Sequence, residues 1–280
     1  MLTMFALPKP FKGHFNVIQR NAIASWARLP SRPEIILFGD EEGTAQAAHD
    51  LGVRHEPNVP RNEFNTPLMS GVFERGYALT ASPMICYINS DIILLGDFLG
   101  AIRQVKAWRL EFLMTGCRLE VDLDEPAAYR TAESEARLRE LVSRQNQPTH
   151  IGAMDYFVFP RSLVPSFPAF TPGAGYWDNW LVGSTIVRGI PVVDASDVVY
   201  AVHQNHGKTI ATWRAIDASV EGRRNWELSG GQNCTRAQAT HRLTSRGIRS
   251  NFRRRTFYKM LEKTRGFRHA LGICRSKPTA

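Results

Sequence analysis

Short apolar runs alternate with helix-spaced apolar positions along the first part of the chain. The runs predict strands at residues 2–7, 34–38, 53–56, 84–88 and 111–115. Between them, apolar residues at every third or fourth position predict helices at residues 14–29, 44–51, 67–81 and 97–108. This alternation indicates βαβ units, so we expect an α/β fold with a mostly parallel sheet flanked by helices.

The rest of the chain is less regular. Residues 116–125 are polar and acidic, which predicts a loop, and the proline-rich residues 162–175 predict irregular structure. Periodicity around these segments predicts a charged helix at 131–144, a strand at 155–159, a helix at 177–187 and one or two strands within 192–202.

The strand expected at Met84–Ile88 is followed by three small polar residues, Asn89, Ser90 and Asp91. The run is short and rich in β-formers, as expected for a buried strand of a parallel sheet. Asn, Ser and Asp favour turns by themselves, so these residues could simply end the strand. A carboxylate here would equally lie at the sheet edge where open α/β sheets bind ligands.

Positive charge is concentrated towards the carboxyl terminus of the 280-residue chain, whose formal net charge is +9. Residues 223–280 contain 15 Lys and Arg against 2 acidic residues, a net +13, so residues 1–222 carry a net −4. We therefore divide the chain into a main domain at residues 1–222 and a basic extension at residues 223–280. Such segregation of charge indicates an anionic partner for the extension.

The basic extension contains an amphipathic helical pattern. Its apolar stripe and the surrounding cations comprise Phe257, Met260, Leu261, Thr264, Phe267 and Leu271 with Arg253, Arg254, Arg255, Lys259, Lys263 and Arg268. This pattern predicts binding to an anionic membrane surface. The alternatives are a helix packed on the main domain and, third, binding to nucleic acid. We do not expect a nucleic-acid partner, because the main domain shows no RNA-binding motif.

Several sequence features bear on location. The chain has no apolar run of about 18 residues, so no transmembrane helix is expected. The amino-terminal segment lacks a charged region before its apolar stretch and a small-residue cleavage site, so no secretory signal is expected. Four widely spaced cysteines without a CxxC motif fit free thiols in a reducing compartment. We expect a cytoplasmic protein that is peripheral at the membrane.

Several sequence blocks, taken in order, resemble those of a known class of enzymes. The blocks are ALPKPF, FGDEEG, YINSDIILLGDF, DYFVFP, GYWDNW and VHQNH. Their order along an α/β chain resembles the GT-A class of nucleotide-sugar-dependent glycosyltransferases, over roughly residues 1–210. The resemblance implies transfer of a sugar from a nucleoside diphosphate sugar, here a UDP-sugar, to an acceptor hydroxyl. It also implies dependence on Mn²⁺ or Mg²⁺.

The resemblance assigns metal ligands. GT-A enzymes hold the metal with a DxD motif, and this chain has NSD, so Asp91 keeps the ligand position while Asn89 and Ser90 would contact the donor. A late histidine often completes the metal shell in this class. His203 is the first choice here and His206 the second, and Lys208 would face the diphosphate. A divalent cation bridging the diphosphate oxygens would stabilise the leaving group.

The resemblance also places the donor's nucleoside. Backbone groups of Ala6, Leu7 and Pro8 would line the base slot. Asp40 would accept the uracil imide proton, although an Asp ahead of a glycine can equally be a turn residue. Two residues before the next predicted helix, Arg61 and Asn65, would reach the ribose or phosphate, with a solvated loop as the alternative.

The resemblance also assigns a role to the start of the helix expected at residues 177–187, where the acceptor would lose its proton. In the resembling enzymes that invert configuration, a carboxylate there takes the proton of the acceptor hydroxyl, which makes Asp178 the expected general base. The alternative is an acidic residue favoured by the helix dipole. Trp177 and Asn179 would contact the acceptor, although tryptophans are also ordinary core residues. Asp155 and Arg118 would hold donor or acceptor hydroxyls, and the acceptor itself would be a glycan or lipid-linked molecule.

Two other functions stay open. A sugar-nucleotide pyrophosphorylase uses a related sheet but needs a Gly-rich loop bearing Arg and Lys after the first strand, and LPKPFKGH has one glycine. The chain also contains no GxGxxG or GxxxxGK phosphate loop. A non-catalytic membrane or RNA adaptor would use the basic extension, with NSD as a degenerate remnant.

Overall fold

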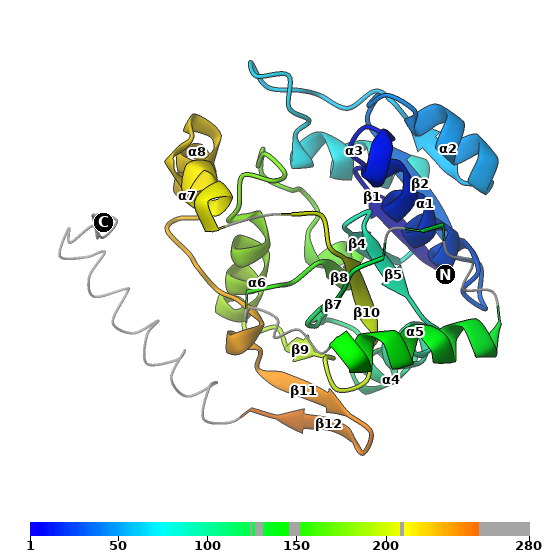
Figure 1. Cartoon of the computed structure of the whole chain (residues 1–280). Helices are drawn as coiled ribbons and strands as arrows, with labels where there is room; N and C mark the ends of the chain where they lie inside the picture. Colours follow the sequence, from blue (N-terminus) through cyan, green and yellow to red (C-terminus); the bar gives the residue numbers. More distant parts are fainter. Residues whose placement is uncertain (124, 127–130, 146–151, 208–209, 252–280) are drawn as a thin grey trace.

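The computed structural model describes residues 1–280 apart from 124, 127–130, 146–151, 208–209 and 252–280. Strands and helices alternate through the first part of the described chain, and longer connections follow (Figure 1). Lys208 and the amphipathic pattern at 253–271 lie outside the described residues, so their expected roles stay predictions.

The main sheet runs through the middle of the molecule. Its strands are β1 (Leu2–Ala6), β2 (Glu34–Phe38), β3 (Arg54–Glu56), β4 (Met84–Ile88), β6 (Leu113–Thr115), β8 (Tyr156–Pro160), β9 (Val192–Asp194), β11 (His241–Thr244) and β12 (Gly247–Ser250). In the described residues their order is β12-β11-β9-β6-β8-β4-β1-β2-β3. The β1–β4 group is parallel, whereas β8 runs antiparallel to both β4 and β6. The expected mostly parallel sheet flanked by helices is confirmed.

Three short strands form a second, smaller sheet. They are β5 (Ile92–Leu94), β7 (Leu119–Val121) and β10 (Ala201–Gln204), in the order β5-β10-β7. Strand β10 is antiparallel to β5 and parallel to β7. Its register places His203 opposite Ile92, the residue that follows Asp91. This pairing brings two distant parts of the chain together.

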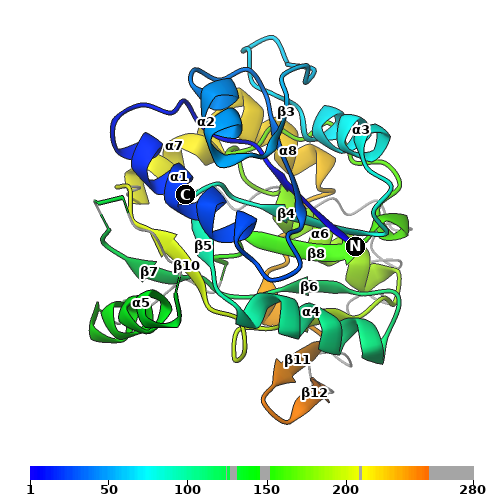
Figure 2. The same ribbon diagram turned by 90° about the vertical axis from the view of Figure 1, so that its right-hand side faces the viewer.

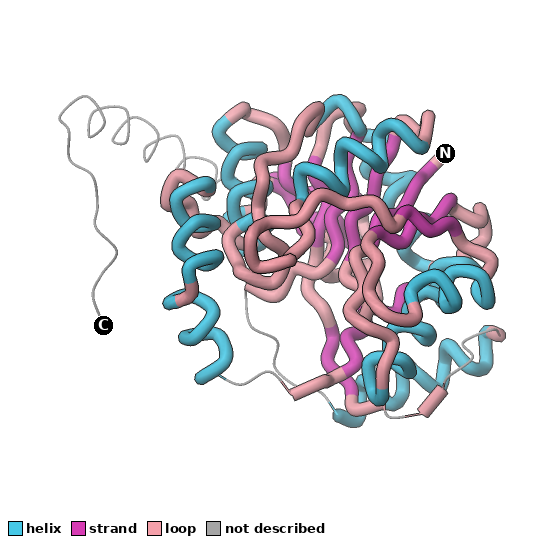
Figure 3. Tube along the Cα trace, turned by 90° about the horizontal axis from the view of Figure 1, so that it is seen from above, coloured by secondary structure: helices cyan, strands magenta, loops and turns pink. Residues whose placement is uncertain are grey.

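Helices cover both faces of the main sheet (Figures 1 and 2). They are α1 (Gly13–Ala27), α2 (Thr44–Leu51), α3 (Met69–Leu79), α4 (Asp97–Trp108), α5 (Ala132–Gln145), α6 (Trp177–Val187), α7 (Ile210–Ala218) and α8 (Val220–Leu228). Side chains of α1, α2 and α4 share one apolar core, and those of α3 and α6 share another. Because neighbouring strand residues point to opposite faces, Met4 joins the first core and Phe5 the second. From above, the strands lie between helices (Figure 3).

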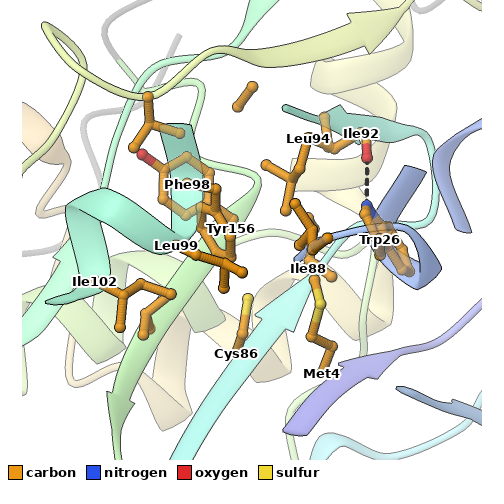
Figure 4. Close-up of a cluster of buried hydrophobic side chains, with 14 of the residues drawn as sticks. Met4, Trp26, Cys86, Ile88, Ile92, Leu94, Phe98, Leu99, Ile102 and Tyr156 are labelled. Atoms are coloured by element: carbon orange, nitrogen blue, oxygen red, sulfur yellow. Dashed lines mark hydrogen bonds between the residues drawn. The ribbon is translucent and has the colours of Figure 1, made fainter. Parts of the chain in front are cut away.

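Helix α1 is fixed to β5 by a buried tryptophan (Figure 4). The Trp26 side chain is fully buried, and its Nε1 donates a hydrogen bond to the Ile92 carbonyl oxygen at 2.7 Å. The neighbouring Ser25 hydroxyl accepts a hydrogen bond from the Leu94 amide at 3.1 Å. Since β5 begins directly after Asp91, these contacts hold α1 beside the end of the central strand.

The polar segment at residues 116–125 was expected to be a loop, and that expectation is wrong for Leu119–Val121. These three residues form β7, which pairs with β10, a strand about 80 residues later in the sequence. Such a short strand with mixed polarity is stabilised by its partner rather than by its own pattern. The run after Asp91, to which no element was assigned, forms β5 for the same reason.

The fold continues past the division placed after residue 222. That position falls inside α8, and residues farther along form β11, which pairs in parallel with β9. Leu243 of β11 is fully buried in the first core, and Cys234 joins the second. Residues 223–251 are therefore part of the same sheet and cores as the main domain.

Among the described residues, no helix is long and apolar enough to cross a membrane. Among the described residues, Cys86 and Cys117 are free thiols. Burial raises the pKa of the Cys86 thiol far above its ordinary value, so that sulfur is an inert core atom rather than a nucleophile.

Candidate active site

The polar residues of the candidate site lie along one edge of the main sheet. Strands β1, β2 and β4 are parallel, so the segments that follow them, beginning at Leu7, Gly39 and Asn89, leave the sheet at its same edge. Strand β8 runs the other way, and its register places Tyr156 opposite Ile88. Asp155, just ahead of β8, therefore lies at this edge too.

Three potential metal ligands lie together at the end of the central strand. Asp91, His203 and His206 each offer one ligand atom, and these atoms lie within 4.8 Å of one another. The Nε2 atoms of His206 and His203 lie 3.0 Å and 3.6 Å from Asp91 Oδ2. From the sequence, His203 is the first choice of ligand and His206 the second, and the structure brings both to the same carboxylate.

Buried contacts from α1 hold this cluster in place. The Gln204 side chain is fully buried, and its Nε2 donates hydrogen bonds to the Asp91 carbonyl at 3.1 Å and the Ile18 carbonyl at 2.8 Å. Asn21 of α1 donates to Gln204 Oε1 at 2.9 Å. On the other side, the rings of Phe15 and His206 lie 5.2 Å apart between centroids. Residues of α1 thus contact the cluster on two sides.

The electrostatics of the cluster suit cation binding. Burial alone would raise the pKa of Asp91, but its hydrogen bond with His206 and its electrostatic interaction with the His203 imidazole hold that pKa below its ordinary value. Burial lowers the pKa of His203, with Asp91 opposing the shift. The preferred state is therefore an ionised carboxylate beside a neutral imidazole, and these are the protonation states in which both groups bind metals.

Two buried atoms in this cluster have no hydrogen-bond partner among the described residues. They are Asp91 Oδ1 and His203 Nδ1. A buried carboxylate oxygen without a partner is costly, which makes it a candidate ligand atom. One carboxylate and two imidazoles are a donor set that Mn²⁺ accepts readily. The residues present thus fit the divalent cation that the resemblance to GT-A enzymes implies.

Asn89 and Asp155 are joined beside the cluster. The side-chain Nδ2 of Asn89 donates a hydrogen bond to Asp155 Oδ1 at 2.6 Å. The backbone N–H of Asn89 donates a second one to the backbone carbonyl of Asp155 at 2.9 Å. Arg118 reaches both carboxylate oxygens of Asp155 at 3.1 and 3.2 Å and pairs with Glu120 at 2.9 Å. Asp155 is almost fully buried, so Arg118 compensates a charge that burial would otherwise make costly.

Asp178 lies in the first turn of α6 and has a shifted pKa. Burial and the nearby charge of Asp155 raise the pKa of Asp178 to about 6, against a hydrogen bond from the Asn179 amide at 2.9 Å. Removal of a carboxylate from water is a usual cause of such a shift, and a nearby like charge adds to it. A carboxyl group with this pKa is ionised at neutral pH yet basic enough to take a proton.

The two neighbours of Asp178 have structural contacts. The Trp177 side chain is buried in the second core, with its ring edge-to-face against Tyr87 at 5.0 Å and Phe157 at 5.1 Å. The core therefore covers most of this side chain, which leaves little of Trp177 for the contact with the acceptor that was expected of it. Asn179 Nδ2 donates to the Cys234 carbonyl at 2.8 Å, which ties α6 to the segment ahead of β11.

The residues expected to hold the nucleoside also gather at one place. Leu7, next to buried Ala6 and Pro8, lies against Gly39, where an added Cβ would stand 3.3 Å from the Leu7 side chain. Asp40 forms an ion pair with Arg61. Arg61 also pairs with Glu41 at 3.0 Å and donates to the Asn65 carbonyl at 2.7 Å. The four loop residues thus bind one another, with the Asp40 side chain largely exposed.

Ser90 has a role that the sequence did not indicate. Its hydroxyl donates to Gln19 Oε1 at 2.8 Å. The same Gln19 side chain accepts from the Lys9 amide at 2.7 Å and donates to the Lys9 carbonyl at 2.9 Å. Gln19 is almost fully buried on α1. A polar residue on the apolar face of a predicted helix was the signal that could have identified it.

Helix α8 adds another residue that sequence reasoning missed. Asn225 is fully buried, and its side chain accepts from the Thr171 amide at 3.0 Å and donates to the carbonyls of Thr171 and Gly175 at 2.8 Å. Glu221 of the same helix accepts from Asn62 at 2.6 Å. Helix α8 therefore links the loop that precedes Asp178 to the loop that contains Arg61.

A cavity of about 660 Å³ lies away from these residues. It is lined by Tyr77, Met84, Lys106, Leu110 and Arg161, among others. Met84 begins β4, whereas Asp91 follows its end, so this cavity is at the opposite edge of the sheet. It does not coincide with the candidate site.

Comparisons with known proteins agree with this architecture. No protein-family model and no curated protein matches the sequence. Among solved structures, glucosyl-3-phosphoglycerate synthase of M. tuberculosis matches with a TM-score of 0.52 and 16% identity, covering 83% of this chain and 81% of that one. The chain has the GT-A fold of nucleotide-sugar glycosyltransferases.

Two further structures with this GT-A fold contain ligands. The same synthase in complex with Mn²⁺, UDP-glucose and phosphoglyceric acid matches with a TM-score of 0.51 and 17% identity, covering 83% of this chain and 80% of that one. A mannosyltransferase from Pyrobaculum calidifontis in complex with GDP-mannose and Mn²⁺ matches with a TM-score of 0.53 and 11% identity, over 84% of this chain and 65% of that one. At such identities the likeness establishes the fold alone.

Proposed function

We propose that this chain is a metal-dependent glycosyltransferase that moves a sugar from a UDP-sugar to an acceptor hydroxyl. The supporting observation is the cluster of Asp91, His203 and His206 at the carboxyl end of β4 in a GT-A fold. The loops after β1 and β2 lie at the same edge, where the nucleoside would bind. Two similar structures hold Mn²⁺ together with UDP-glucose or GDP-mannose.

The cluster would hold the divalent cation. Asp91 supplies carboxylate oxygens, one of them buried without a partner, while His203 and His206 supply imidazole nitrogens. A bound Mn²⁺ or Mg²⁺ neutralises charge on the departing diphosphate. Two imidazole ligands favour Mn²⁺, because Mg²⁺ prefers an all-oxygen shell.

Asp178 would act as the general base. Its pKa of about 6 leaves it ionised at neutral pH, where it takes the acceptor hydroxyl's proton as the oxygen attacks the sugar. A single attack by a deprotonated acceptor inverts the configuration at the reacting carbon, so we propose an inverting reaction. Asp155, held by Asn89 and Arg118, would accept hydrogen bonds from sugar or acceptor hydroxyls.

The remaining assignments concern the donor's nucleoside and the acceptor. Backbone groups of Ala6, Leu7 and Pro8 would line the base slot. The ion-paired side chains of Asp40 and Arg61 would contact the base and the ribose from the opposite side of this slot. We propose a glycan or lipid-linked acceptor, which an enzyme bound to a membrane through residues 252–280 would reach at the surface.

A thermal-stability screen of nucleotide sugars tests the proposed function. A UDP-sugar at 100 times its dissociation constant stabilises the folded state by about 2.7 kcal/mol, a rise in melting temperature of roughly 5–10 °C for a chain of this size. We expect that rise with Mn²⁺ and its loss with EDTA. Melting temperatures that stay constant across UDP- and GDP-sugars with either Mn²⁺ or Mg²⁺ would contradict the proposal.

A further inference from the structure

We propose that Lys9 is the side chain that binds the donor's diphosphate. This inference rests on the proposed function. The nucleoside end of the donor site is formed by residues 6–8 and 39–40, and the metal end by Asp91 and the two histidines. A diphosphate joins these two ends. Lys9 directly follows Pro8, so the chain brings a cation to the start of that path.

The backbone of Lys9 is fixed relative to Asp91. Gln19 binds both its amide and its carbonyl, at 2.7 and 2.9 Å, in the manner of a strand neighbour. The oxygen of Gln19 that accepts from the Lys9 amide also accepts from the Ser90 hydroxyl at 2.8 Å. Ser90 immediately precedes Asp91. One almost fully buried amide therefore couples the loop after β1 to the metal ligand.

The side chain of Lys9 lies over a ring that also packs near one of the metal ligands. Its Nζ lies 4.4 Å from the centroid of the Phe15 ring, whose centroid is 5.2 Å from that of His206. His206 in turn lies 3.0 Å from Asp91. The ammonium of the exposed Lys9 is thus held over the Phe15 ring, and that ring separates it from His206.

The chemistry of transfer explains why a cation is needed there. The bond between the sugar's anomeric carbon and a diphosphate oxygen breaks, and its electron pair stays on that oxygen. The proton lost by the acceptor goes to Asp178, so none is available to neutralise the leaving group. A nucleoside diphosphate carries more negative charge than one divalent cation offsets. The Lys9 ammonium would donate charge-assisted hydrogen bonds to the phosphates.

The experiment compares binding of diphosphate and nucleoside by the full chain. Calorimetry in the presence of Mn²⁺ first measures the affinities of the wild type for UDP and GDP. The diphosphate that binds more tightly and its parent nucleoside are then titrated into each variant. Loss of a charge-assisted hydrogen bond predicts that Lys9→Gln weakens diphosphate binding about 10–100-fold and nucleoside binding less than about 3-fold. Lys9→Arg retains most of the diphosphate affinity. Lys12→Gln is the matched control, because that lysine lies in the same loop, paired with Glu42 at 2.5 Å.

Each alternative outcome is decisive. Equal diphosphate affinity in Lys9→Gln and wild type would overturn the assignment of Lys9 and leave the proposed function standing. Equal losses for diphosphate and nucleoside would show that Lys9 only shapes the loop, and would also overturn it. A wild type that binds neither UDP nor GDP would overturn the proposed function and this inference together.

Discussion

Asp178 shows how position within a fold changes the chemistry of one carboxyl group. An exposed acid at a helix start would have a low pKa because the helix dipole favours its charge. Burial and the charge of Asp155 reverse that preference and raise the pKa of Asp178 to about 6. The sequence could identify an acid at the start of α6, but its pKa depends on packing that involves β8. A structural acid and a base thus become distinguishable only in three dimensions.

The role of Asp178 predicts a pH profile. The ionised form is the active one, so kcat/KM should be lost below pH 6, rise through about pH 6 and level off above it. Asp178→Asn should lower the transfer rate about 10²–10⁴-fold, the usual contribution of a general base, and leave donor affinity unchanged. Steady-state kinetics with the best donor from the screen, alongside UDP calorimetry, measures both. A variant with a normal rate constant but weak UDP binding would make Asp178 a donor contact.

At the scale of elements, α8 connects parts of the candidate site that lie far apart in sequence. Asn225 binds both ends of the turn from Thr171 to Gly175, and Tyr176 after it adopts a left-handed backbone conformation with φ of 65°. That conformation is unfavourable for tyrosine and persists only where surrounding contacts impose it. We infer that α8 sets the direction in which α6 begins, and so the position of Asp178.

A variant of α8 tests this inference. Asn225→Ala leaves the Thr171 amide and two carbonyls without their partner, which predicts a loss of about 2–4 kcal/mol in unfolding free energy. We also expect a lower transfer rate with donor affinity little changed. Urea unfolding and kinetics measure these effects. The control is Arg224→Ala on the same helix, whose exposed pair with Glu63 predicts a loss below about 1 kcal/mol. Equal behaviour of the two variants would contradict a role for Asn225.

Elements with long periodic patterns were predictable, and elements made by distant pairing were not. The strand at Met84–Ile88 and the helices α1, α2 and α4 follow from apolar spacing alone. Strands β5 and β7 have three residues each and exist because β10 pairs with both. The candidate site follows the same rule. Asp91 and the two histidines were predicted from the resemblance to GT-A enzymes, whereas Gln19 and Asn225 are defined by contacts with loops elsewhere.

For the whole molecule, the charge division and the structural division differ. Charge alone separated residues 1–222 from 223–280, yet residues 223–251 supply most of α8 and all of β11 and β12 to the fold. The distribution of charge along a sequence does not show which segments pair in a sheet. A hairpin at the edge of a sheet can carry many basic residues on its exposed face and still belong to the fold. The amphipathic stripe begins only after this point. A truncation that tests the stripe therefore belongs after Asn251 rather than after Gly222.

We predict that residues 252–280 bind anionic membrane surfaces. Each Lys or Arg near such a surface contributes about 1 kcal/mol, and the attraction falls off within a Debye length. The full chain should co-sediment with anionic vesicles at low salt and be released at high salt. A chain ending at residue 251 should stay in the supernatant, with unchanged nucleotide binding. Equal recovery of both chains in the supernatant would contradict membrane binding, and insolubility of the shorter chain would assign the stripe to the core.

The central claim is that Asp91 and its two histidines hold the metal that binds the donor, and titration of UDP in Mn²⁺ tests it most directly. We predict that Asp91→Asn loses more than about 100-fold in Mn²⁺-dependent UDP affinity, beyond the range of residues that only support a metal ligand. Its melting temperature without ligand should stay close to that of the wild type. Asp197→Asn, which removes a carboxylate paired with Arg242 at 2.5 Å, should bind UDP normally. Unchanged Mn²⁺-dependent affinity in Asp91→Asn would contradict the account.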